Sequence, residues 1–118
     1  MKLTPILTCL ATGLIAVTAH AQSADKYPER PIRIIIPYQA GGGTDVMTRI
    51  IVEKVRERTK QPFIIDTKPG ANTLIGVKAL LASPADGYTL MMTSSATFHT
   101  APLVVKNPGY DPLESFSL

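Results

Sequence analysis

Five residues, Ile32 to Ile36, lie between prolines at positions 31 and 37, and four of the five are isoleucine. A near-continuous β-branched run of this kind is typical of a strand that is buried on both faces of a parallel sheet. The glycines Gly41, Gly42 and Gly43 follow shortly after it, and beyond them the apolar residues recur at helical spacing. A buried strand that leads through a glycine loop into a helix predicts an α/β fold.

The first helix is expected over residues 44–60, where the Thr44 hydroxyl can cap a free amide of the first turn. Four apolar residues recur at helical spacing and are expected to face the sheet: Met47, Ile50, Ile51 and Val55. The remaining elements are expected in this order: a strand at 63–65, a helix capped by Asn72 or Thr73 and ending near 82, a strand at 88–93, and a short helix over 103–106.

The order β-α-β-α-β has crossovers long enough for parallel pairing of the strands. In such units every strand-to-helix loop emerges at the carboxyl edge of the sheet, where open α/β sheets bind ligands. The loops at 37–44, 66–73 and 93–97 are therefore expected to gather on one side of the sheet.

The glycine loop presents bare N–H groups at the positive end of a helix, which favours an anion. The alternative is a tight turn that needs glycine for packing alone. The loop matches neither the dinucleotide-binding spacing nor the phosphate loop with its Lys-Ser or Lys-Thr pair. Asp45 would complement the helix dipole and repel a dianion, so a monoanion held by neutral groups fits better.

Other polar side chains near this edge have two interpretations each. Tyr38 can stack on a ligand or cover the end of the sheet, and Lys68 can meet an anion or stay solvated. Four hydroxyl residues can bind a ligand or cap the next helix: Thr93, Ser94, Ser95 and Thr97.

Signals for catalysis, metals and nucleic acid are weak. Ser94 and Ser95 do not lie in a G-x-S-x-G motif, and His99 has no evident acidic partner. No H-E-x-x-H motif or Cys/His cluster is present, so neither a metal nor a cofactor is expected. The formal charge of +3 is small and dispersed, which argues against nucleic acid or an anionic membrane as partner.

The first 21 residues have the pattern of a cleavable signal peptide. Lys2 supplies a positive start, residues 6–17 are mostly apolar, and Ala19-His20-Ala21 is a cleavage signal. The single cysteine, Cys9, lies inside this segment. The mature chain, residues 22–118, is therefore expected to be exported and to contain no thiol.

Ordered motifs along nearly the whole mature chain resemble the Bug family, the solute receptors of tripartite tricarboxylate transporters. They are Tyr27-Pro28, Arg30-Pro31-Ile32-Arg33, Pro37-Tyr38, Gly41-Gly42-Gly43-Thr44-Asp45, Gln61-Pro62, Lys68-Pro69-Gly70-Ala71, Ile75-Gly76, Pro84-Ala85-Asp86-Gly87-Tyr88-Thr89-Leu90 and Tyr110-Asp111-Pro112. Several motifs in the family's order are far more specific than the glycine loop alone.

The resemblance implies a periplasmic binding protein with two α/β lobes that close on a small carboxylate, without catalysis. It implies delivery of the ligand to the transporter's membrane permease, and a monomer is expected. It also implies which groups meet the ligand, through ordered waters and backbone atoms as well as hydroxyls: Tyr38, Gln39, Ala40, Gly41, Gly42, Gly43, Thr44, Asp45, Ala71, Asn72, Thr93, Ser94, Ser95 and Thr97.

Two departures from the family pattern stand out. Asn72 and Thr73 occupy positions where the family often has glycines. Family members are more than twice this length, so residues 22–118 correspond to an incomplete first lobe, which is expected to bind weakly or not at all alone. Two alternatives to a receptor are a stand-alone exported interaction module and a small hydrolase that uses Ser94 or Ser95.

Overall fold

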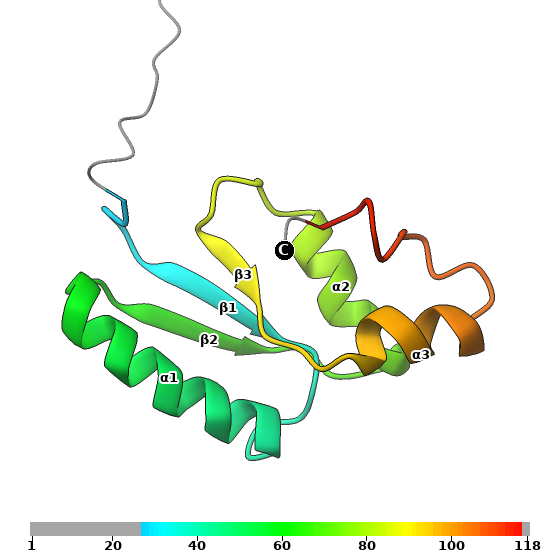
Figure 1. The fold of residues 1–118 in the computed structure, drawn as a ribbon, viewed down its shortest axis with the longest axis horizontal. Helices are drawn as coiled ribbons and strands as arrows, with labels where there is room; N and C mark the ends of the chain where they lie inside the picture. The colour runs from blue at the N-terminus through cyan, green and yellow to red at the C-terminus, as the bar shows by residue number, and fades with distance from the viewer. Residues whose placement is uncertain (1–26, 117–118) are drawn as a thin grey trace, which may run out of the picture.

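A computed structural model describes residues 27–116, so the expected signal peptide lies outside the described residues. The elements alternate between strand and helix along the chain, as Figure 1 shows. The strands are β1 (Ile32–Ile36), β2 (Phe63–Thr67) and β3 (Thr89–Met91). The helices are α1 (Gly43–Thr59), α2 (Leu74–Leu81) and α3 (Ala96–Val104), with one 3-10 turn, η2 (Ala71–Thr73).

The three strands form one parallel sheet in the order β2-β1-β3. Ile34 at the centre of β1 is opposite Ile65 of β2 and Leu90 of β3. The four isoleucines of β1 are all buried, and Ile35 and Ile36 are fully so. The α/β class, the parallel pairing and the doubly buried first strand are therefore confirmed.

The strand order places the first two helices on opposite faces of the sheet. The chain moves from β1 to one side to reach β2, then back across β1 to reach β3. Right-handed crossovers in opposite directions require the connecting helices to lie on different faces. Figure 1 shows α1 on one side of the strands and α2 on the other. Val52 of α1 packs with Ile32, Ile34 and Ile36 in the core cluster of the first face.

The expected inward face of α1 is wrong for three of its four residues, since only Val55 is partly buried. Met47, Ile50 and Ile51 are 57%, 60% and 45% exposed, whereas Thr48 and Val52 are buried, together with Asp45. Apolar side chains wrap around more than one face of this helix, so spacing alone does not choose the buried one. The Thr48 hydroxyl donates to the Thr44 carbonyl at 2.6 Å, and this bond within the helix lets a polar residue face the core.

The expected cap of α1 is also wrong. Gly42 is the N-cap, no side chain caps the helix, and Thr44 lies within it. Thr73 does occupy the N-cap position of α2, but its side chain makes no capping hydrogen bond. In α2, Val77 is buried, while Leu81 is 41% exposed.

The last helix differs from the expected short helix at 103–106. α3 begins at Ala96, within the loop expected at 93–97, and it contains Pro102. Within residues 27–116 no helix is long and apolar enough to cross a membrane.

One close contact between helix and sheet depends on a glycine. A Cβ built on Gly76 of α2 would lie 2.7 Å from the Cβ of Pro37 and 3.1 Å from its Cα. No real side chain could occupy that space without a shift of the backbone. Gly76 therefore lets α2 approach the end of β1, where the first loop starts.

Candidate functional site

The three strand-to-helix loops meet at the carboxyl edge of the sheet, as expected. The Lys68 amide donates to the Ile36 carbonyl at 2.8 Å, and the Met92 amide donates to the Ile35 carbonyl at 3.0 Å. These bonds hold the starts of the second and third loops beside the end of β1. Next to them lies a cavity of about 370 Å³.

The glycine loop leaves its backbone open. Gly41 has φ of +81°, which suits glycine. A Cβ built on Gly43 would have no atom within 4 Å, so packing does not explain why this residue is glycine. The first backbone bond of α1 runs from the Val46 amide to the Gly42 carbonyl at 3.0 Å. The amides of residues 43–45 precede it, so they have no acceptor within the helix.

Asp45 fixes the shape of this loop from inside. Its carboxylate Oδ2 accepts hydrogen bonds from the Gly41 amide at 2.8 Å and from Arg49 Nε at 3.1 Å. The Arg49 bond, followed by the Gly41 bond, lowers the pKa of this carboxyl below its ordinary value. The side chain of Asp45 is only 3% exposed, and Arg49 Nη2 lies 3.0 Å from Oδ1, so the acid is neutralised locally.

A cluster of hydroxyls joins the first loop to the third. The Tyr38 hydroxyl lies 2.7 Å from Ser94 Oγ, 3.3 Å from Thr93 Oγ1 and 3.4 Å from Thr97 Oγ1. Thr93 and Thr97 also bond to each other at 2.5 Å. The Tyr110 hydroxyl donates to the Thr97 carbonyl, also at 2.5 Å, from beyond α3. Thr97 is fully buried, so part of this cluster holds the loops in place.

Two opposing effects act on Tyr38. Partial burial raises the pKa of its phenol, but the hydrogen bonds with Ser94, Thr93 and Thr97 outweigh burial, so the pKa lies below its ordinary value. A hydroxyl network of this kind can exchange donors and acceptors by rotation. It can therefore adapt to a ligand oxygen placed next to it.

The end of the second loop has a glycine-like backbone at three residues that are not glycine. Ala71, Asn72 and Thr73 have φ of +47°, +50° and +74°, all in the left-handed region. This region is uncommon for residues with a side chain, and most so for a β-branched residue such as threonine. The two departures from the family pattern therefore keep the backbone course that glycine would allow. Thr73 is 8% exposed, and no hydrogen-bond partner of its Oγ1 is found among residues 27–116.

Some of the expected site residues line the cavity, and others do not. Tyr38, Gln39 and Asn72 line it. The other expected residues lie outside its wall: Gly41, Gly42, Gly43, Thr44, Asp45, Ala40, Ala71, Thr93, Ser94, Ser95 and Thr97. The rest of the wall was not among the expected site residues: Pro37, Pro69, Gly70, Thr73, Ala96, Thr100, Ala101 and Val104. Residues Pro69 to Thr73 fall in a loop expected at this edge. Pro37 and Ala96 also fall in expected loops, whereas Thr100, Ala101 and Val104 of α3 had no such signal, because the expected helix began only at residue 103.

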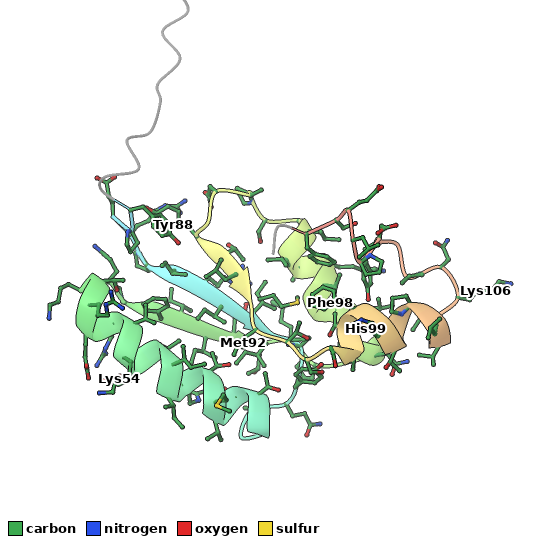
Figure 2. The ribbon with its side chains drawn as sticks, viewed as in Figure 1. Lys54, Tyr88, Met92, Phe98, His99 and Lys106 are labelled. Atoms are coloured by element: carbon green, nitrogen blue, oxygen red, sulfur yellow. The ribbon has the colours of Figure 1, made fainter. Side chains whose placement is uncertain are left out.

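The arrangement offers no pairing for serine catalysis in the described part. The Ser94 hydroxyl contacts the Tyr38 hydroxyl. His99 Nδ1 lies 3.0 Å from the backbone carbonyl oxygen of Ser95, and Figure 2 shows the His99 side chain on α3. Among residues 27–116 no three His, Cys, Asp or Glu side chains gather as a metal site. What this edge does offer is neutral donors: amides, hydroxyls and the Gln39 and Asn72 side chains.

A parallel sheet with a cavity at its loop edge places this chain in the α/β class. Its likeness to solved periplasmic binding proteins, with TM-scores of 0.68 and above, makes it part of an α/β lobe of that fold. Residues 47–117 match the family described as the tripartite tricarboxylate transporter family receptor. The chain belongs to this family, so the Bug resemblance is confirmed.

Known relatives and structures agree with this assignment. Protein BugT of Bordetella pertussis is 40% identical over 108 residues, which cover 89% of this chain and 31% of BugT. The solved periplasmic binding protein BugD has a TM-score of 0.68 at 38% identity, covering 76% of this chain and 30% of BugD. Rpa4515 of R. palustris, solved with adipate, has a TM-score of 0.70 at 33% identity, covering 74% and 29%. The chain thus spans less than a third of these proteins.

Proposed function

We propose that this chain is the ligand-binding edge of the first lobe of a periplasmic receptor, which captures a small carboxylate and delivers it to the membrane permease of a tripartite tricarboxylate transporter. The receptor acts by binding and not by catalysis. The proposal also includes export through a cleaved signal peptide at residues 1–21.

The observation that carries the proposal is the open space above Gly43. The first amides of α1 have no acceptor within the helix, and nothing within 4 Å would meet a Cβ at that residue. A carboxylate or a bridging water can reach these amides, and the positive helix end favours it. The nearest acid, Asp45, is already bonded to Arg49 and Gly41, which reduces its repulsion of an anion.

The neutral cavity wall supports a carboxylate held without a formal cation. None of the described residues that line the cavity is charged. Amides, hydroxyls and bridging water can hold a carboxylate in this way. Rpa4515 was solved with adipate, which supports a dicarboxylate of similar size as a first probe.

The test is a titration of the natural gene product, isolated from the periplasm, with adipate and other small carboxylates by calorimetry. The variant Gly43→Ala places a methyl group over the open amides without a steric clash. We expect its affinity to fall by about tenfold or more, since a hydrogen bond to a charged group is worth roughly 1.5–3 kcal/mol. Its stability should be equal or slightly higher, because alanine favours a helix.

The matched control is Arg58→Ala, a substitution of an exposed residue in the last turn of the same helix. It should leave the affinity unchanged. If Gly43→Ala binds as the wild type does, the glycine loop is only a turn. The isolated segment 22–118 should bind at least tenfold more weakly than the natural product if the latter is longer, because a cleft needs two walls; micromolar binding by the segment would contradict this.

A further inference from the structure

Lys68 is a basic residue at the start of the second loop, yet it does not line the cavity. Its amide donates to the Ile36 carbonyl at 2.8 Å, so its backbone lies at the end of β1. The next residue, Pro69, is part of the cavity wall. The Lys68 Nζ instead lies 3.5 Å from Oδ2 of Asp66, which belongs to β2. The side chain therefore runs back toward the strand, where a carboxylate of the chain itself receives it.

The Asp66 carboxylate is held in place from the central strand. Arg33 of β1 donates to the same Oδ2 from Nε, at 2.9 Å, and from Nη2. Two donors on one rigid guanidinium fix the position of that oxygen. The side chains of Asp66, Arg33 and Lys68 are 26%, 39% and 32% exposed, so water and salt screen this cluster only in part. Lys68 therefore meets a carboxylate whose position is set by the sheet and not by the loop.

The pairing of Lys68 with Asp66 bears on the charge of the ligand edge. Arg33 and Lys68 are cations and Asp66 is an anion, so the cluster has an excess of one positive charge, yet the described residues of the cavity wall are all uncharged. A further carboxylate on a ligand would meet the Lys68 ammonium only if that ammonium left Asp66. Such a move exchanges one carboxylate partner for another. Ion pairs that are partly exposed contribute little, so the exchange yields almost no net affinity.

On the basis of the proposed function, we infer that Asp66 is a positioning residue that holds the Lys68 ammonium back from the ligand edge and thereby limits the charge of the carboxylate that this edge favours. The amides and hydroxyls of the loops satisfy a ligand of low charge, and an extra carboxylate gains nothing. Without the Asp66 carboxylate, the flexible stem of Lys68 can turn from β2 toward the cavity. The edge would then acquire a cation and would favour ligands of higher charge.

The test compares two ligands that differ by one carboxylate, because tricarballylate is glutarate with a third carboxylate on its central carbon. The Kd of each is measured by calorimetry for the natural gene product, for Asp66→Asn, for Lys68→Met and for the double variant. We expect Asp66→Asn to bind tricarballylate about fivefold more tightly than the wild type does, the upper range for a partly exposed ion pair, while its Kd for glutarate changes by less than about twofold. The double variant should lose this gain, because its ammonium is gone. A merely structural role of Asp66 would weaken the binding of both ligands together.

Lys68→Met keeps the pair of Asp66 with Arg33, so it tests the inference even if Asp66→Asn does not fold. It should bind both ligands within about twofold of the wild type, because the wild-type ammonium does not meet the ligand. A loss of about tenfold or more in Lys68→Met would show that Lys68 already contacts the ligand, and would overturn the inference. So would an unchanged ratio of the two Kd values in Asp66→Asn. A gain that persists in the double variant would also overturn it, because Arg33 would then be the cation concerned. If the wild type binds no small carboxylate at all, the proposed function itself fails.

Discussion

The Tyr38 hydroxyl, two residues beyond β1, lies 2.7 Å from the Ser94 hydroxyl, three residues beyond β3. The two residues are 56 positions apart in sequence, and their bond joins the first loop to the third. The distance between these loops, and with it one side of the candidate site, therefore depends on this pair.

A double-mutant cycle with Tyr38→Phe and Ser94→Ala measures this link. We expect a coupling in the free energy of unfolding of roughly 0.5–1.5 kcal/mol, the usual net value of a hydrogen bond. Denaturant unfolding of the four proteins provides the measurement. Strict additivity would show that Thr93 and Thr97 take over the contact when either partner is removed.

The sheet carries an acid-sensitive ion pair. Asp66 Oδ2 accepts from Arg33 Nε at 2.9 Å, and Lys68 Nζ lies 3.5 Å away. The hydrogen bonds from Arg33 are the main cause that holds the pKa of Asp66 below its ordinary 3.8. Asp45 is lowered in the same direction by Arg49 and Gly41.

A carboxyl whose pKa is depressed by folding stabilises the protein above its unfolded pKa, and this contribution disappears as the pH falls through the folded value. We therefore expect the free energy of unfolding to decrease as the pH drops below about 4. The variant Asp66→Asn should show a shallower decrease in chemical denaturation between pH 5 and the acid limit. An equally steep decrease in this variant would show that the acid sensitivity comes from groups other than Asp66.

Gly76 gives a third prediction. The variant Gly76→Ala places a Cβ against Pro37, so either α2 or the end of β1 must move. We expect a loss of roughly 1–3 kcal/mol in the free energy of unfolding, the usual effect of overpacking. Gly43→Ala is the matched control, because its added Cβ meets open space. Equal melting temperatures for the two variants would show that the close contact at Pro37 is not required.

The strands and their order in the chain could be predicted because β1 is apolar on both faces and most of the connecting loops contain glycine or proline. The buried face of α1 could not be predicted from spacing. Met47, Ile50 and Ile51 are apolar but exposed, and a threonine that bonds to its own helix replaces them in the core. Periodicity shows which positions of a helix are apolar, but it does not show which of them pack against the sheet.

In the candidate site, too, some features could be predicted from the sequence and others could not. The convergence of three loops follows from parallel topology, and it is present. The role of Thr73 in the wall could not be predicted, because its expected use was as a cap and its left-handed backbone is an exception among β-branched residues. Likewise, the wall that α3 supplies depends on a helix that starts seven residues before the expected one.

The bond between Asp45 and the Gly41 amide bears on how fast a ligand can be taken up. Both of its partners belong to the chain itself, so the conformational entropy of ordering the glycine loop is lost during folding and not at the moment of encounter. Association at this loop therefore involves no slow rearrangement of its backbone. Differences in residence time among carboxylates would arise from the other contacts of each ligand, and the rate of capture would be nearly the same for all of them.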